Sequence, residues 1–117
     1  MRDHTKLIAF KFADDLAVYT YQVTKNFPKE EIYGLTSQMR RAAVSVPSNI
    51  VEGCMRESQT EYLRFLEIAF GSLKELHYQF TLSAKLGFIK ESELNENENK
   101  YIETEKVLGA LIRSLRK

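Results

Sequence analysis

The chain has 117 residues, of which 44% are hydrophobic and 28% charged, the length and composition of one soluble globular domain. Its formal net charge of +1 excludes a global field that would attract nucleic acid or a membrane, so any nucleic-acid site must be a local patch. A single cysteine excludes an intrachain disulfide, and without a membrane span or a signal peptide we expect a cytoplasmic protein.

The first predicted helix covers residues 5–26. Its apolar residues recur at steps of three and four, as on one face of a helix. These residues are Ala9, Phe12, Leu16, Tyr19 and Val23. Phe27 ends the helix, because the residue before Pro28 disfavours the α conformation. We expect one short helical turn after Pro28, before the next long helix begins.

The second predicted helix covers residues 36–54 and has a proline well inside it. Thr36 or Ser37 is the expected N-cap. Pro47 lacks the N–H that an inner helix position donates, so we expect a kink there. Gly53 is expected to help end the helix, since glycine commonly occurs at helix ends.

The third predicted helix, residues 58–86, is the longest, and the fourth covers residues 92–115. Ser58 and Glu61 have the spacing of a capping box, and Gly87 is a glycine cap. A heptad seam runs along the third helix. Its members are Tyr62, Leu66, Ala69, Leu73, Leu76, Phe80, Ser83 and Gly87. Four amphipathic helices with short connections predict an all-α fold, an antiparallel up-down-up-down four-helix bundle that forms a single domain over residues 1–117.

The third helix has more apolar surface than one seam uses. Phe65, Ile68 and Phe70 flank the seam and widen it. An apolar surface of this width left exposed to water favours association. We therefore expect a homo-oligomer, with these three residues in structural or interface roles.

No constellation for catalysis, metal binding or cofactor binding stands out. His77 and His4 have no Glu-x-x-His pairing of the kind that di-metal bundles use, so we expect them to be solvated or hydrogen-bonded. Cys54 lies at a helix end with no histidine nearby in sequence and suits a small buried hydrophobe. The five glycines are scattered rather than grouped in a phosphate-binding loop. The sequence thus predicts a protein that is not an enzyme and carries no metal or cofactor.

A polar stripe follows one side of the second predicted helix. Its members are Gln38, Arg41, Ser45, Ser48, Asn49, Glu52 and Arg56. Arginine, serine and asparagine are residue types that contact phosphate and sugar oxygens, which favours a nucleic-acid site. The alternative is an intramolecular or intersubunit network, and Glu52 among the arginines supports it, because a phosphate site disfavours a carboxylate. The residues leave both interpretations open.

Three runs of the chain carry a resemblance to a known family. They are FP and YGLTSQMRRAA within residues 27–43, VPSNIVEG at 46–53 and RFLEIAFGSLKEL at 64–76. The sequence resembles the bacterial four-helix-bundle family encoded in intervening sequences of 23S ribosomal RNA genes. That resemblance implies a ring-like homopentamer with a link to RNA. A related branch, the accessory protein of diversity-generating retroelements, binds nucleic acid and a reverse transcriptase.

The leading hypothesis is a non-enzymatic, homo-oligomeric bundle that associates with RNA or another nucleic acid, or serves as an assembly module. The predicted nucleic-acid contacts are Arg40, Arg41, Asn49 and Arg56, with a second patch of Arg113, Arg116 and Lys117. The other hypothesis is a protein-interaction scaffold with no nucleic-acid role, in which the same stripe is a subunit interface. Pro47, Glu52 and Gly53 are then structural or interface residues.

Overall fold

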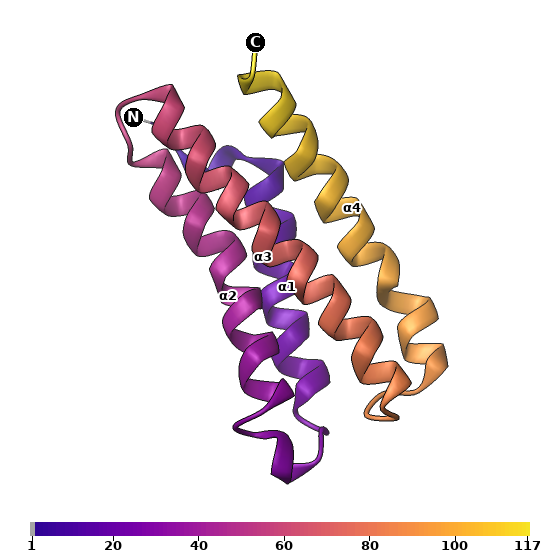
Figure 1. Ribbon diagram of the computed structural model, residues 1–117. Helices are drawn as coiled ribbons and strands as arrows, with labels where there is room; N and C mark the ends of the chain where they lie inside the picture. Colours follow the sequence, from indigo (N-terminus) through magenta and orange to yellow (C-terminus); the bar gives the residue numbers. More distant parts are fainter. Residues whose placement is uncertain (1) are drawn as a thin grey trace.

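The computed structural model describes residues 2–117, which form four long helices. The elements are the 3₁₀ turn η1 (His4–Lys6), α1 (Ile8–Thr24), the 3₁₀ turn η2 (Lys29–Glu31), α2 (Leu35–Cys54), α3 (Gln59–Lys85) and α4 (Glu91–Leu115). Within this range there is no strand, so the predicted all-α fold with four helices is confirmed. Connections between successive helices lie alternately at the two ends of the elongated molecule (Figure 1).

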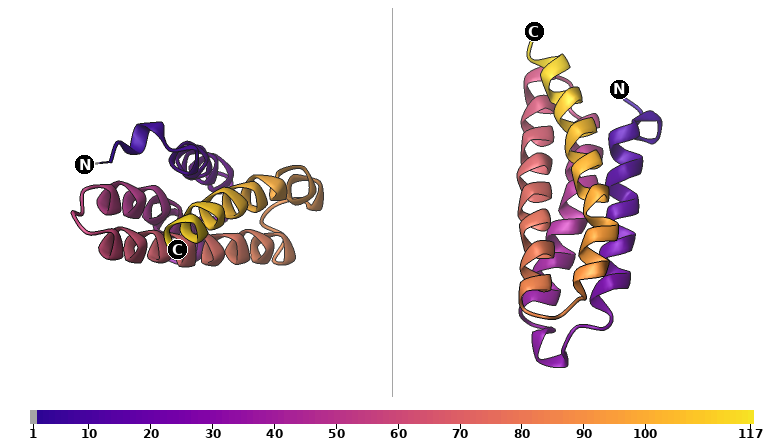
Figure 2. Two further views of the ribbon diagram at one scale, coloured as in Figure 1. Left: turned by 90° about the horizontal axis from the view of Figure 1, so that it is seen from above. Right: turned by 90° about the vertical axis from the view of Figure 1, so that its right-hand side faces the viewer.

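Each helix packs against two others and makes little contact with the third. The contact between α2 and α3 is the most extensive, whereas α1 and α4 share the smallest of the four helix–helix contacts. In the right-hand view of Figure 2, α4 lies between α3 and α1. The molecule measures 43 × 26 × 19 Å, and none of the helices within residues 2–117 combines the length and hydropathy that a membrane span requires.

The buried face of α1 differs from the predicted one. Phe12 is 37% exposed, while Ala13, beside it in the sequence, is fully buried. Two threonines are also buried, because their hydroxyls donate to backbone carbonyls one turn earlier: Thr20 to Leu16 at 2.8 Å and Thr24 to Thr20 at 2.7 Å. Because each hydroxyl is hydrogen-bonded within its own helix, a threonine can occupy a core position. A search for periodic apolar residues does not detect such a position.

The helix ends show which predicted caps form. The Ser58 hydroxyl accepts the Glu61 N–H at 3.1 Å, which is one of the two hydrogen bonds of the predicted capping box, and Gly87 has the φ of 79° expected of a glycine cap. In contrast, α2 begins at Leu35 rather than at residue 36, and neither Thr36 nor Ser37 is its N-cap. The Glu31 carboxylate from η2 accepts the Leu35 N–H at 3.0 Å instead.

Helix α1 is shorter than predicted at its start. Asp3 caps η1 by accepting the Thr5 N–H at 3.0 Å. The Thr5 hydroxyl, which donates to the same carboxylate at 2.6 Å, and this N–H together hold the pKa of the Asp3 carboxyl below its ordinary value. The chain is extended at Leu7, so the α-helix begins only at Ile8 instead of residue 5.

Gly53 lies one residue before the end of α2 at Cys54. A Cβ at position 53 would lie 3.0 Å from the Phe65 Cβ and 3.3 Å from the Tyr62 carbonyl oxygen. Glycine therefore favours the close approach of α2 to α3. Pro47 lies buried inside the same helix, which is assigned as continuous from Leu35 to Cys54.

Candidate nucleic-acid interface

The predicted polar stripe of α2 separates into two parts, and the first borders a hollow beside α1. This hollow, which we call the arginine hollow, has a volume of about 470 Å³ and lies where the end of α1 meets the start of α2. Its lining residues are Tyr21, Ile32, Thr36, Ser37, Arg40, Arg41 and Val44. The lining includes two arginines and no carboxylate, so the hollow is cationic although the whole chain is nearly neutral.

Arg40 is held in place by neutral partners. Its Nε donates to the Thr24 hydroxyl at 2.9 Å, and its guanidinium carbon lies 4.7 Å from the centroid of the Tyr21 ring. Cation–π contact of this kind contributes about 0.5–1 kcal/mol at exposed sites. The side chain is thus ordered against α1, while its positive charge has no carboxylate to neutralise it.

Arg41 is the freer of the two arginines. It is exposed to solvent and points from the next position of α2 into the lining of the same hollow. Across residues 2–117, neither Arg40 nor Arg41 takes part in an ion pair. Two unneutralised guanidinium groups at adjacent positions favour an anionic ligand.

The second part of the stripe, at the carboxyl end of α2, is an intramolecular network. Arg56 forms an ion pair with Glu52 at 3.2 Å, and its guanidinium lies over the Phe65 ring at 4.8 Å from the centroid. Arg2 donates to the Arg56 carbonyl at 2.8 Å, which ties the amino-terminal segment to the end of α2. Arg56 and Phe65 therefore connect the end of α2 to α3, while Glu52 pairs with Arg56 one helical turn along the chain.

Asn49 directs its amide back onto its own helix. Its Nδ2 donates to the Ser45 carbonyl at 2.8 Å and lies 3.0 Å from the Ser45 hydroxyl. That hydroxyl also lies 2.9 Å from the hydroxyl of Ser72 on α3. The structure thus places Asn49 in a polar contact between α2 and α3 rather than beside Arg40 and Arg41.

The second predicted patch lies at the end of α4, where α4 contacts α3. Arg116 forms an ion pair with Glu67 at 2.6 Å. A hollow of about 440 Å³ there is lined by Glu67, Phe70, Gly71, Gly109, Ile112, Arg113 and Arg116. Arg113 and Lys117 are exposed. This patch differs from the arginine hollow because a carboxylate stands inside it.

His77 belongs to a cluster that the sequence did not reveal. Its Nδ1 lies 2.6 Å from Glu105 Oε2 and its Nε2 lies 2.9 Å from Glu98 Oε2, while the ring stacks on Tyr101 at 5.4 Å between centroids. Glu98 and Glu105 are seven residues, about two helical turns, apart and so lie on the same face of α4. This spacing is the one sequence feature that could have suggested the cluster. Each carboxylate contacts a different ring nitrogen, so the cluster joins α3 to α4. Within residues 2–117, no three histidine, cysteine, aspartate or glutamate side chains are arranged to bind a metal ion.

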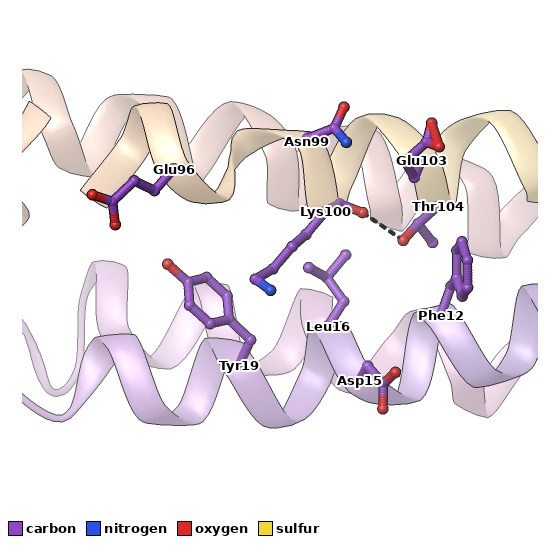
Figure 3. Close-up of a pocket in the computed structure, with 9 residues that line it drawn as sticks. All are labelled: Phe12, Asp15, Leu16, Tyr19, Glu96, Asn99, Lys100, Glu103 and Thr104. Carbon is purple, nitrogen blue, oxygen red and sulfur yellow. Dashed lines mark hydrogen bonds between the residues drawn. The ribbon is translucent and has the colours of Figure 1, made fainter. Parts of the chain in front are cut away.

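A second hollow beside α1 has the opposite charge. This acidic groove, of about 430 Å³, lies between α1 and α4 and includes Asp15, Glu96 and Glu103 (Figure 3). Lys100 reaches from α4 toward Tyr19 and lies 5.5 Å from the centroid of its ring. Burial, together with a hydrogen bond to Glu93, raises the pKa of the Tyr19 hydroxyl above its ordinary value. Three carboxylates against one lysine make this groove unfavourable for phosphate.

Comparison with known proteins assigns the family. The family model of the 23S rRNA-intervening sequence protein matches residues 5–110. The chain belongs to this family. A solved structure from Bacteroides thetaiotaomicron, described as a protein with unknown function from the S23 ribosomal protein family, is similar with a TM-score of 0.79. It is 21% identical, and the match covers 90% of this chain and 98% of that chain, so it shows the fold alone. No curated protein matches.

In this member of the 23S rRNA-intervening sequence protein family, the motif on α2 therefore combines two roles. Pro47 and Gly53 are buried against the rest of the bundle, and Cys54 beside them is fully buried, which raises the pKa of its thiol. Arg40 and Arg41 instead border an open hollow. Of the seven predicted contact residues, these two are brought together without a carboxylate.

Proposed function

We propose that the protein is a non-enzymatic, homo-oligomeric helical bundle of the cytoplasm that associates with RNA or serves as an assembly module, and of these two we favour association with RNA. The arginine hollow carries this proposal, because Arg40 and Arg41 lie at adjacent positions with no carboxylate among the residues beside them. Phosphate oxygens of RNA are the anions that arginines in such a position contact. The near-neutral net charge is no obstacle, since phosphate contact depends on the local arrangement of charge.

RNA binding measured against salt concentration tests the proposal. We expect the wild-type protein to bind RNA at low salt, with an affinity that falls as salt rises because counterions are released from the phosphates. For the double variant Arg40→Ala/Arg41→Ala, the slope of log affinity against log salt should shrink by about one to one and a half, as expected for two lost contacts with single-stranded RNA.

The matched control removes two positive charges elsewhere. Lys11 and Arg64 are exposed and lie outside the arginine hollow, so Lys11→Ala/Arg64→Ala should leave the slope close to that of the wild type. Absence of binding at low salt, or an equal slope for the wild type and the Arg40/Arg41 variant, contradicts the proposal.

The homo-oligomer is a separate part of the proposal, and the family resemblance implies a pentamer. Large apolar side chains stand exposed on a single chain, including Val18 on α1 and Ile68 and Tyr78 on α3. Their burial between subunits would be favourable. Light scattering at micromolar concentration should give about five times the mass of one chain. A monomer at that concentration refutes the oligomer, whatever the outcome for RNA.

A protein-interaction scaffold without an RNA role is the second candidate. It is favoured by the pairing of Glu52 with Arg56 and by the hydrogen bonds of Asn49 to Ser45 of its own helix, which give three stripe residues partners within the chain. In that case the oligomer forms while RNA does not bind at any salt concentration. The two measurements above therefore separate the two candidates.

The proposal also includes the finer architecture of the bundle. We infer an antiparallel up-down-up-down order with a kink of α2 at Pro47. The alternating connections in Figure 1 support the order, and the missing N–H of Pro47 supports the kink. A crystal structure with α2 straight through Pro47 would contradict the second of these.

A further inference from the structure

We propose that the arginine hollow binds single-stranded RNA, with an unpaired base against Tyr21, Ile32 and Val44 and a phosphate at Arg41. This inference rests on the proposed association with RNA and narrows it to RNA whose bases are not paired. Two features of the hollow support it, an exposed apolar floor and a stacked guanidinium.

The floor of the hollow is apolar and open to solvent. Tyr21 of α1 is 44% exposed, Ile32 after η2 is 56% exposed, and Val44 of α2 is 42% exposed. Three separate elements thus direct apolar surface to one place that the chain itself leaves uncovered. An unpaired base has two apolar faces to place on such a floor, whereas a base in a duplex has both faces covered by its neighbours.

The cationic side of the hollow also suits a planar base. The Arg40 guanidinium lies over the Tyr21 ring and is fixed there by its hydrogen bond to Thr24. Guanidinium planes and aromatic rings are both surfaces on which unpaired RNA bases stack. Arg41, exposed beside them, is placed to contact the phosphate that follows the base.

The size and charge of the hollow are consistent with one nucleotide. Its volume of about 470 Å³ is within the range of ~300–1,000 Å³ that ligand pockets occupy. The acidic groove has a similar volume and also contains a tyrosine, Tyr19, but its three carboxylates would repel a phosphate. Of these two hollows, only the arginine hollow joins an apolar floor to unneutralised positive charge.

The experiment compares a labelled RNA single strand of about 12 nucleotides with a duplex of the same sequence, at low salt and with the whole protein. The key variant is Ile32→Ser, and its matched control is Ile8→Ser. Both isoleucines are exposed to a similar extent, 56% and 59%, so neither substitution removes core packing, and only Ile32 lines the hollow. Polyglutamate with the same total charge as the RNA is added as a competitor, to test whether the hollow binds any polyanion.

We expect the single strand to bind at least about tenfold more tightly than the duplex, since stacking of one base is worth ~1–3 kcal/mol. Ile32→Ser should remove most of that preference, while Ile8→Ser should keep it. Equal binding of strand and duplex, equal effects of the two variants, or competition by polyglutamate as strong as by unlabelled single strand would each overturn the inference.

The results also separate this inference from the proposed function. RNA binding that depends on Arg40 and Arg41 but shows no preference for single strands overturns only the single-strand assignment. No binding to either RNA at low salt overturns the proposed function, and this inference with it.

Discussion

The first half of α2 and its carboxyl end, taken with the residues that follow it to Arg56, both carry arginines but use them differently. In the first half, Arg40 and Arg41 border an open hollow, and no carboxylate neutralises them. In the second half, Gly53 allows α3 to approach closely, and Arg56, two residues after the helix ends, is paired with Glu52 and lies over Phe65. An arginine on a helix surface is thus available to a ligand only where its own chain supplies no acid within reach.

The difference also explains how a chain of net charge +1 can have a cationic site. Opposite charges are distributed unevenly around α1, with arginines on the side of α2 and carboxylates on the side of α4. Charges attract a phosphate only over about one Debye length, ~8–10 Å at ordinary ionic strength. The charges near the hollow therefore affect phosphate binding more than the net charge of the chain does. Four predictions test this division of α2 into a binding half and a structural half.

The largest effect is expected from Gly53→Ala in the structural half. The new Cβ would lie 3.0 Å from the Phe65 Cβ, so the two helices must separate. We expect the free energy of unfolding to fall by about 1–2 kcal/mol, the overpacking cost being partly offset by the better helix propensity of alanine. Gly71→Ala on α3 is the control: its Cβ meets nothing within 4 Å, and stability should rise by up to ~1 kcal/mol. Urea denaturation measures both, and equal effects would contradict the close approach at Gly53.

The next effect is expected from Arg41→Glu in the binding half. RNA affinity at low salt should fall by about tenfold, because a phosphate contact is lost and a repelling carboxylate is added. Stability should change by less than ~0.5 kcal/mol, since the Arg41 side chain is exposed. Arg64→Glu on α3 makes the same change of net charge outside the hollow, so titration of RNA onto both variants separates local from global charge. Equal loss of affinity in both variants would place the binding site elsewhere.

Arg56→Ala should give the opposite pattern to Arg41→Glu. It removes the ion pair with Glu52 and the contact with the Phe65 ring, so the free energy of unfolding should fall by about 0.5–1 kcal/mol. RNA affinity should stay within about twofold of the wild type once the general charge effect is subtracted. Thermal unfolding and RNA titration on the same preparation check it; a tenfold loss of affinity would assign Arg56 to the site.

The smallest effect at neutral pH concerns Cys54, in the structural half of α2, and Tyr62, its neighbour on α3. Burial raises the pKa of the Cys54 thiol above its ordinary value of 9.0, and it raises the pKa of the Tyr62 hydroxyl to about 12. Both groups release their protons more readily in the unfolded chain, so stability should be fully present below pH ~9 and decline as pH rises beyond it. Denaturation from pH 7 to 11 tests this, and Cys54→Ala should weaken the decline just above pH 9. A stability that rises with pH in this range would contradict the buried thiol.

Sequence patterns predicted the elements of the bundle well where one local rule decided them. The heptad seam from Tyr62 to Ser83 is buried, and Ser58 and Gly87 cap α3 as expected. Predictions failed where distant parts of the chain compete. Glu31 caps α2 in place of Thr36, and Thr20 and Thr24 occupy core positions in place of larger apolar residues.

The candidate site was predicted in part. Sequence reasoning selected Arg40 and Arg41, but it grouped them with Asn49 and Arg56, which the fold gives other partners. It did not identify Tyr21 or Ile32 as neighbours, because they come from α1 and from the segment after η2. The spacing of residues along the sequence shows which side chains share a face of one helix. It does not show which residues of different helices line the same hollow.

By itself, the sequence determined the family, the number and approximate extent of the helices, and the residue types available on α2. These follow from local periodicity, caps and motifs, which act over a few residues. Only the tertiary structure decided which charges meet a partner from another helix. Whether an arginine meets a carboxylate depends on side chains far apart in the chain, such as Arg116 and Glu67, and on the packing that brings them within 2.6 Å. The same packing leaves Arg40 and Arg41 without a carboxylate in the hollow they share.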